Sequence, residues 1–181
     1  MKKNNIIILL TVIALMLVAC GLILVACGQQ TSVSNPAPVG ESRNVGGHVS
    51  LTVLDVILPA DDMISEPIKY TETPQPNSEY AIIKLRIQCS KLADISCRFS
   101  SFFIDIADQD GSIMMKSQDE YIHSSQLVKA SIPDELGWSM VGLSPGSTLE
   151  GNVVLLVSKY INYTMITYTE LYGSPSYFAM P

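Results

Sequence analysis

The residues of this chain whose type and spacing promise chemistry are its four cysteines, Cys20, Cys27, Cys89 and Cys97. A thiol can be acylated, pair with a second thiol or bind a metal. The first two each end the sequence Leu-Val-Ala-Cys, which occurs twice, seven residues apart, inside an apolar run. Two lysines stand before that run, and residues 6–16 have the length of the apolar region of a secretory signal. The N-terminus therefore predicts export.

The sequence Leu-Val-Ala-Cys resembles the lipobox of bacterial lipoproteins, in which small residues precede a cysteine that takes a diacylglycerol chain. Cys20 lies at the usual distance from the start, but cleavage there would leave an apolar mature N-terminus. Cys27 is followed by polar residues, so we favour Cys27 as the lipidation site and keep Cys20 as the alternate. An uncleaved membrane helix also stays open, because the apolar stretch of about 20 residues is long enough to span a bilayer. The positive N-terminal flank places the following domain outside the cytoplasm, on the cell membrane, in every case.

Cys89 and Cys97 stand eight residues apart in the exported part of the chain, where disulfides persist. Cys89 continues the core-facing register of Ile87, and Cys97 shares parity with Phe99 as the chain returns. We predict a disulfide between them. The alternative is two buried free thiols on strands of opposite sheets, too far apart to bridge.

Other polar residues form weaker candidate sites. Ser139 in GWSMVG lacks the glycine at position 141 that a nucleophile elbow needs. The two histidines, His48 and His123, have no acidic partners at a recognisable zinc spacing. Asp108 and Asp110 could hold calcium in a turn, but an EF-hand loop counted from Gly111 would put Ile at its first position. We expect no enzyme activity, no metal and no cofactor.

Tyrosines crowd the C-terminal part of the chain. Tyr160, Tyr163 and Tyr168 are candidates for a binding surface, since exposed tyrosines stack on glycans and anchor protein partners. Ordinary packing in a strand is the other interpretation, because tyrosine is at home on a half-buried pleated surface.

The charge balance excludes some classes of partner. Seventeen acidic residues outweigh 11 basic ones, and the net charge is −6. No run of lysine or arginine occurs. Nucleic acids and electrostatic membrane docking both require clustered cations, so neither is expected.

The elements that must position these residues are predicted to be strands. Alternation of apolar and polar residues over 49–54, 80–90 and 102–108 predicts half-buried antiparallel strands, with a turn at Asp110-Gly111. The continuous apolar run near 153–157 predicts a strand buried on both faces, and a last strand is expected over 160–168. Residues 28–46, rich in Pro, Gly and polar residues, predict a flexible tether spanning roughly 25 Å. The predicted organisation is a signal segment over 1–27, a tether over 28–46, and an all-β, immunoglobulin-like antiparallel β-sandwich over 47–181.

Several strings carry a family resemblance across residues 47–168: Gly47 with Val49-x-Leu51-x-Val53, EYAIIKLRI, Ile106-x-Asp108-x-x-Gly111, Leu143-x-Pro145-Gly146 and Leu149-Glu150-Gly151-x-Val153-Val154. Together they resemble the telokin-like, immunoglobulin-like domain of unknown function found in bacterial lipoproteins. The sequence departs from that pattern at Cys89-Ser90 and at Leu155. The resemblance implies a sandwich fold and an exported location, and it implies no shared catalytic residues.

These observations predict a membrane-anchored extracytoplasmic lipoprotein that acts as a non-catalytic binding or envelope-associated module. Its expected partners are the membrane, through the lipid anchor, and an envelope protein or a glycan. The alternatives are an exported lipoprotein that carries a ligand or a metal and, further from the observations, an exported hydrolase.

Overall fold

The computed structural model describes residues 31–64, 77–116, 121–123, 125–128, 132–136, 140–170 and 173–181. The predicted signal segment, with Cys20 and Cys27, lies outside these residues. The strands are β1 (Ser42–Gly46), β2 (Val49–Ile57), β3 (Ser78–Cys89), β4 (Cys97–Phe99), β5 (Ile104–Asp108), β6 (Met114–Lys116), β7 (Tyr121–His123), β8 (Ser125–Val128), β9 (Val141–Leu143), β10 (Thr148–Ser158), β11 (Tyr163–Tyr168) and β12 (Ser176–Ala179). Two short 3-10 turns are η1 (Asp61–Met63) and η2 (Ser101–Phe103).

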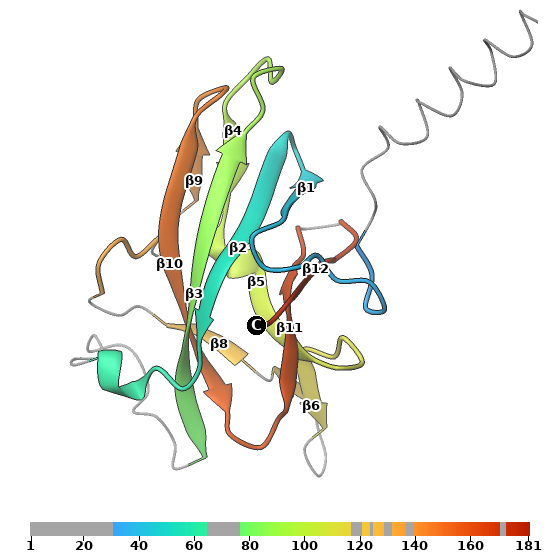
Figure 1. The fold of residues 1–181 in the computed structure, drawn as a ribbon, viewed down its shortest axis with the longest axis vertical. Coiled ribbons are helices and arrows are strands. Elements are labelled where there is room, and N and C mark those ends of the chain that lie inside the picture. Colours follow the sequence, from blue (N-terminus) through green and yellow to red (C-terminus); the bar gives the residue numbers. More distant parts are fainter. Residues whose placement is uncertain are drawn as a thin grey trace, which may run out of the picture. The chain divides into compact units, whose positions relative to one another are not determined.

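The strands form two main sheets, so the predicted all-β antiparallel sandwich is confirmed (Figure 1). One sheet has five strands in the order β1-β2-β3-β10-β8, and the other has three in the order β12-β11-β5. Two further pairs, β4 with β9 and β6 with β7, complete the described strands. All of these strand pairs are antiparallel.

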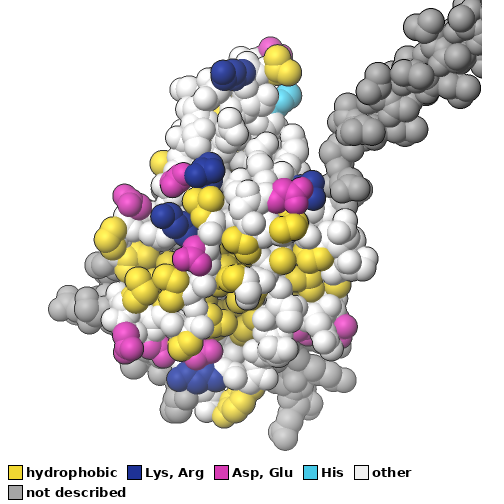
Figure 2. Space-filling view, in the orientation of Figure 1, with side chains coloured by type: hydrophobic (Ala, Val, Ile, Leu, Met, Phe, Trp, Pro, Cys, Tyr) yellow, Lys and Arg dark blue, Asp and Glu magenta, His cyan; other side chains and the backbone are white. Residues whose placement is uncertain are grey.

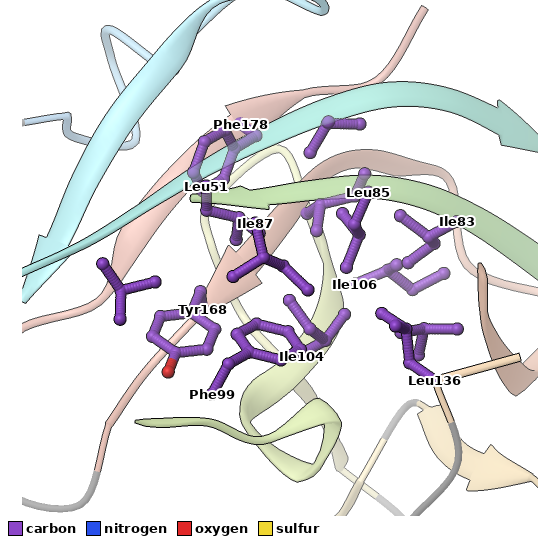
Figure 3. Close-up of a cluster of buried hydrophobic side chains, with 14 of the residues drawn as sticks. Leu51, Ile83, Leu85, Ile87, Phe99, Ile104, Ile106, Leu136, Tyr168 and Phe178 are labelled. Atoms are coloured by element: carbon purple, nitrogen blue, oxygen red, sulfur yellow. The ribbon is translucent and has the colours of Figure 1, made fainter. Parts of the chain in front are cut away.

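The core lies between the two main sheets. On β3 the alternation predicted from the sequence is observed, because Ile83, Leu85 and Ile87 are fully buried while Lys84 and Arg86 are exposed. The side chains that fill the space between the sheets come from both of them, as Figure 3 shows for Leu51, Leu85 and Ile87 on one side and Ile104, Ile106, Tyr168 and Phe178 on the other. Burial of one apolar face from each sheet is the main source of stability of such a sandwich.

The outer face of the five-stranded sheet carries a second, smaller apolar cluster. It consists of Ala60, Ile64, Tyr80, Ile82 and Val154, with Ile57, Ile132 and Leu156 packed beside it. Figure 2 views this face and shows hydrophobic side chains gathered between charged groups. The segment around η1 is fixed to the sheet there, since the Tyr80 N–H donates to Asp61 Oδ1 over 2.9 Å. The prediction that β10 is buried on both faces is therefore confirmed.

The Pro-Gly and Glu-Gly sequences before and within β10 have structural reasons. Gly146 adopts a φ of 79° in the turn that precedes β10, a conformation that favours glycine. At Gly151 a Cβ atom would clash with the Leu136 side chain and with the Asp134 carbonyl, so a side chain there would displace the 132–136 loop. Two backbone hydrogen bonds hold that loop against β10. The Asn152 N–H donates to Asp134 O, and the Leu136 N–H donates to Asn152 O.

The predicted flexible tether over 28–46 is wrong for the residues from Thr31 onward. Ala37 is fully buried, and its N–H donates to Tyr177 O at the edge of the three-stranded sheet over 2.9 Å. Farther along, the Gly40 N–H donates to Val53 O, and β1 pairs with β2 at the edge of the five-stranded sheet. The segment thus covers one open edge of each sheet. Exposed edges are a liability that a covering segment removes, which explains why so polar a stretch is ordered.

Candidate functional site

An apolar depression lies where β4, η2, the start of β9 and the end of β11 meet. Its lining residues are Arg98, Phe99, Ser100, Phe103, Met140 and Glu170, and its volume is about 180 Å³. The pairing of β4 with β9 places Phe99 opposite Val141, so that the preceding residue, Met140, reaches the rim. We call this hollow the aromatic depression.

Phe99 and Phe103 form its aromatic floor, and Tyr168 packs against both rings from within the core. The rings of Phe99 and Tyr168 stack with centroids 5.6 Å apart, and Phe103 meets Tyr168 edge-on at 6.0 Å. Offset-stacked and edge-to-face pairs of this kind are the favoured aromatic geometries. Tyr168 and Phe99 are buried in the core, as Figure 3 shows, so the floor is a rigid part of the sandwich.

Tyr168, which packs behind this floor, carries a hydroxyl group. Its hydroxyl donates to Glu170 Oε1 over 3.4 Å. Burial of the ring, then the Glu170 charge and this hydrogen bond, raise the pKa of Tyr168 well above its ordinary value. The phenol, neutral at physiological pH like an ordinary tyrosine, serves as a hydrogen-bond donor to the carboxylate.

The polar groups around the depression are suited to recognition. The Ser100 side chain accepts a hydrogen bond from the Phe102 N–H, at 3.3 Å, and so caps η2. Arg98 and Glu170 add one cation and one anion to the lining. Beside them, Phe102 and Met140 leave 57% and 59% of their surface exposed. An apolar floor with charged groups at its margin can bind an apolar group that carries polar substituents.

Of the two interpretations of the C-terminal tyrosines, packing in a strand holds for Tyr163 and Tyr168, so the candidate binding surface over Tyr160, Tyr163 and Tyr168 is not formed. Tyr163 and Tyr168 are 8% and 1% exposed, because both lie on β11 and pack into the core between the sheets. The Tyr163 hydroxyl accepts the Ser158 N–H at 3.0 Å. Tyr160 is 74% exposed and lies before the strand, where its hydroxyl donates to Asn77 Oδ1 at 2.8 Å. The three tyrosines therefore do not share a surface.

Cys89 and Cys97 are joined by a disulfide, with an Sγ–Sγ distance of 2.04 Å and a Cα–Cα distance of 5.6 Å. This agrees with the parity argument made from the sequence. Both residues belong to the core, and the bond closes the loop over residues 90–96. At the tip of that loop, Leu92 and Ile95 are 85% and 77% exposed.

The acidic turn is held by hydrogen bonds from its backbone N–H groups to its own Asp108 side chain. Asp108 Oδ1 accepts the N–H groups of Asp110 and Ser112, each at 2.9 Å, which is the geometry of an Asx turn. Within the described part of the chain no group of three potential ligands could hold a metal ion. His48 occupies the turn between β1 and β2 with a φ of 64°. Ser139 lies outside the described residues, as does the side chain of His123.

Arg98, Phe103, Met140 and Glu170 are not among the candidate site residues predicted from the sequence. The density of aromatic residues in RFSSFF is a usable signal, but the sequence predicts a strand from residue 102, where the structure has the 3-10 turn η2. Glu170 lies 72 positions after Arg98 in the chain. The two residues come together because β11, which ends just before Glu170, pairs with β5, which directly follows β4 and η2.

No family model matches the chain, and no curated protein matches it. Among solved structures, the fold is similar to that of ycdA from Bacillus subtilis subsp. subtilis str. 168, described as a "putative lipoprotein", with a TM-score of 0.50 and 15% identity. The match covers 78% of this chain and 38% of ycdA, so the chain spans well under half of that protein's length. At this identity the likeness concerns the fold alone. Within the residues that the structure describes, no helix is both long enough and apolar enough to cross a membrane.

Proposed function

We propose that this chain is an exported lipoprotein, anchored to the outer side of the cell membrane through a lipid on Cys27, and that it acts as a non-catalytic binding module. The observation that carries the proposal is the twice-repeated Leu-Val-Ala-Cys directly after an apolar signal region. The disulfide supports an oxidising compartment. The fold likeness to a protein that is itself described as a lipoprotein points the same way.

The proposed binding surface is the aromatic depression with Phe102 beside it, and its proposed partner is a protein of the cell envelope. Phe, Met and Arg are enriched in protein interfaces relative to the rest of a surface. The exposed Phe102 and Met140 next to Arg98 supply all three residue types. The rigid aromatic floor means that little conformational freedom would be lost on binding.

The family resemblance also belongs to this proposal. We assign the sandwich to the telokin-like, immunoglobulin-like domains on the strength of the Pro145-Gly146 and Glu150-Gly151 sequences. The close approach of Leu136 to Gly151 gives a physical reason for the second of these glycines.

Labelling with a radioactive or clickable fatty acid, followed by mass spectrometry of the mature N-terminal peptide, tests the anchor. We expect the label on Cys27, its loss in Cys27→Ser, and its retention in Cys20→Ser. A label on Cys20 would change the anchoring residue and keep the class. An unmodified N-terminus beginning at Met1 would overturn the proposal.

Site-specific photo-crosslinking in intact cells tests the binding surface. A photoreactive amino acid at position 140 should form one dominant protein adduct, and the exposed substitution Arg98→Glu should weaken it. The same amino acid at position 160, exposed but outside the depression, is the control. Equal adducts from both positions, or an adduct indifferent to Arg98→Glu, would contradict the assignment of this surface.

A further inference from the structure

The first described residues are an integral part of the sandwich, fastened at both of its sheets. The Tyr177 N–H donates to Thr31 Oγ1 over 2.9 Å, which fixes the start of the segment to β12. Ala37 is fully buried, and its backbone pairs with β12 in both directions. Its N–H donates to Tyr177 O at 2.9 Å, and its carbonyl accepts the Ala179 N–H at 2.8 Å. The domain that an anchor would hold therefore begins at Thr31.

We propose that the lipid on Cys27 holds this domain through a linker of only three residues, 28–30, so that the face around Thr31 lies against the lipid headgroups. We call this linker the leash. The inference rests on the proposed lipidation. Residues 28–30 are all that separates Cys27 from Thr31, and four extended residues span at most about 14 Å. A free tether reaching to residue 46 would give a root-mean-square span of roughly 25 Å and leave the domain free to turn.

The face around Thr31 also includes the acidic turn that follows β5. A Cβ atom on Gly111 would lie 2.7 Å from Val33 Cγ2, so the 31–38 segment and this turn are in contact. Asp108 and Asp110 belong to the turn, and neither it nor the 31–38 segment contains lysine or arginine. Anionic headgroups would repel such a face. Its closeness to the membrane is therefore imposed by the leash and owes nothing to charge attraction, so we expect that added salt will not weaken it.

The opposite side of the domain provides the matched reference. Figure 1 shows the turquoise helical turn η1 on the other side of the sandwich from the blue 31–41 segment. Asp62 in η1 is exposed, as is Asp110 in the acidic turn. Cysteine substitutions at these two aspartates change the charge equally and touch neither the core nor the aromatic depression.

The experiment measures energy transfer from a fluorescent donor on Asp110→Cys or Asp62→Cys to acceptor-labelled headgroups in vesicles that carry the lipidated full chain. The acylated Cys27 and the Cys89–Cys97 disulfide leave the introduced thiol as the labelling site. We expect at least threefold stronger transfer from position 110 than from position 62. Insertion of 20 Gly and Ser residues between Gln30 and Thr31 should remove the difference.

Each remaining outcome overturns the inference in a recognisable way. Equal transfer from both positions in the chain of natural length, with the protein still floating with the vesicles, means that the leash does not orient the domain. A lipid on Cys20 would lengthen the leash to about 37 Å and remove the orientation while the lipoprotein proposal stands. Failure of the protein to float with the vesicles would instead contradict the lipoprotein proposal itself.

Discussion

The segment from Thr31 to Gly46 and the loop over residues 90–96 are held to the same sandwich in opposite ways. The segment is polar and is fastened by backbone hydrogen bonds to the edges of both sheets, with one small side chain, Ala37, buried in the core. The loop presents two large aliphatic side chains to solvent and is closed by a covalent bond between its ends. The difference teaches that an irregular stretch is ordered by what its backbone or its ends are joined to, and its hydropathy is a poor guide.

Removing the anchor point of the N-terminal segment should have the largest effect on this comparison. In Ala37→Asp a carboxylate would enter a fully buried position in the hydrophobic core, beside Phe178. We expect the free energy of unfolding to fall by about 3 kcal/mol or more, because an unpaired buried charge is strongly unfavourable. Urea unfolding of the purified protein measures it.

The matched control is Asn35→Asp, which adds the same charge two residues earlier at an exposed position. It should change the free energy of unfolding by no more than about 0.5 kcal/mol. Similar losses in both variants would mean that the added charge alone, and not the seating of Ala37, is responsible.

Opening the loop should have the second largest effect. The double variant Cys89→Ala/Cys97→Ala releases a loop of about nine residues, for which the chain-entropy relation gives roughly 2.5 kcal/mol of lost stability. The companion variant Leu92→Ser/Ile95→Ser keeps the loop closed and changes only exposed side chains, so its stability should stay within about 0.5 kcal/mol. Urea unfolding measures both. Two thiols that titrate in the unfolded, unreduced protein would show instead that the loop is not covalently closed.

The sequence was informative where the evidence is local. Period-two alternation identified β3 and its inward face, the apolar run identified β10, and parity along two short stretches placed Cys89 opposite Cys97. These features depend on neighbours within about ten residues. Their physical basis is the alternation of side chains between the two faces of a strand, which appears in the sequence as alternating apolar and polar residues.

Features that depend on distant partners were not predictable in this way. Thr31 and Ala37 are ordered by Tyr177 and Ala179, which lie some 140 residues away. Nothing in the sequence distinguishes Tyr163 and Tyr168 from Tyr160. The first two are buried because they lie on β11, whereas Tyr160 is exposed because it precedes that strand. The aromatic depression likewise combines residues from β4, η2, β9 and the end of β11, whose proximity is set by the topology alone.

The smallest expected effect concerns the place where the N-terminal segment ends. The Glu170 carboxylate lies against the Gly46-Gly47 turn and accepts the Tyr168 hydroxyl, so it links the end of β1 to the end of β11. Tyr168→Phe removes this long hydrogen bond and should cost only about 0.5 kcal/mol near neutral pH.

The pH dependence of Tyr168→Phe is more distinctive. Because folding raises the pKa of Tyr168 above its unfolded value near 10, the folded state holds the phenolic proton more tightly than the unfolded state does. The resulting stability is fully present below pH 10 and is lost as the pH rises above it. Urea unfolding between pH 9 and 11.5 should show the steepest loss for the natural chain, a smaller one for Glu170→Gln, and the smallest for Tyr168→Phe. Tyr80, whose pKa is also raised by burial and by Asp61, titrates equally in all three proteins. Parallel curves would show that the Tyr168 hydroxyl is open to water in the folded protein.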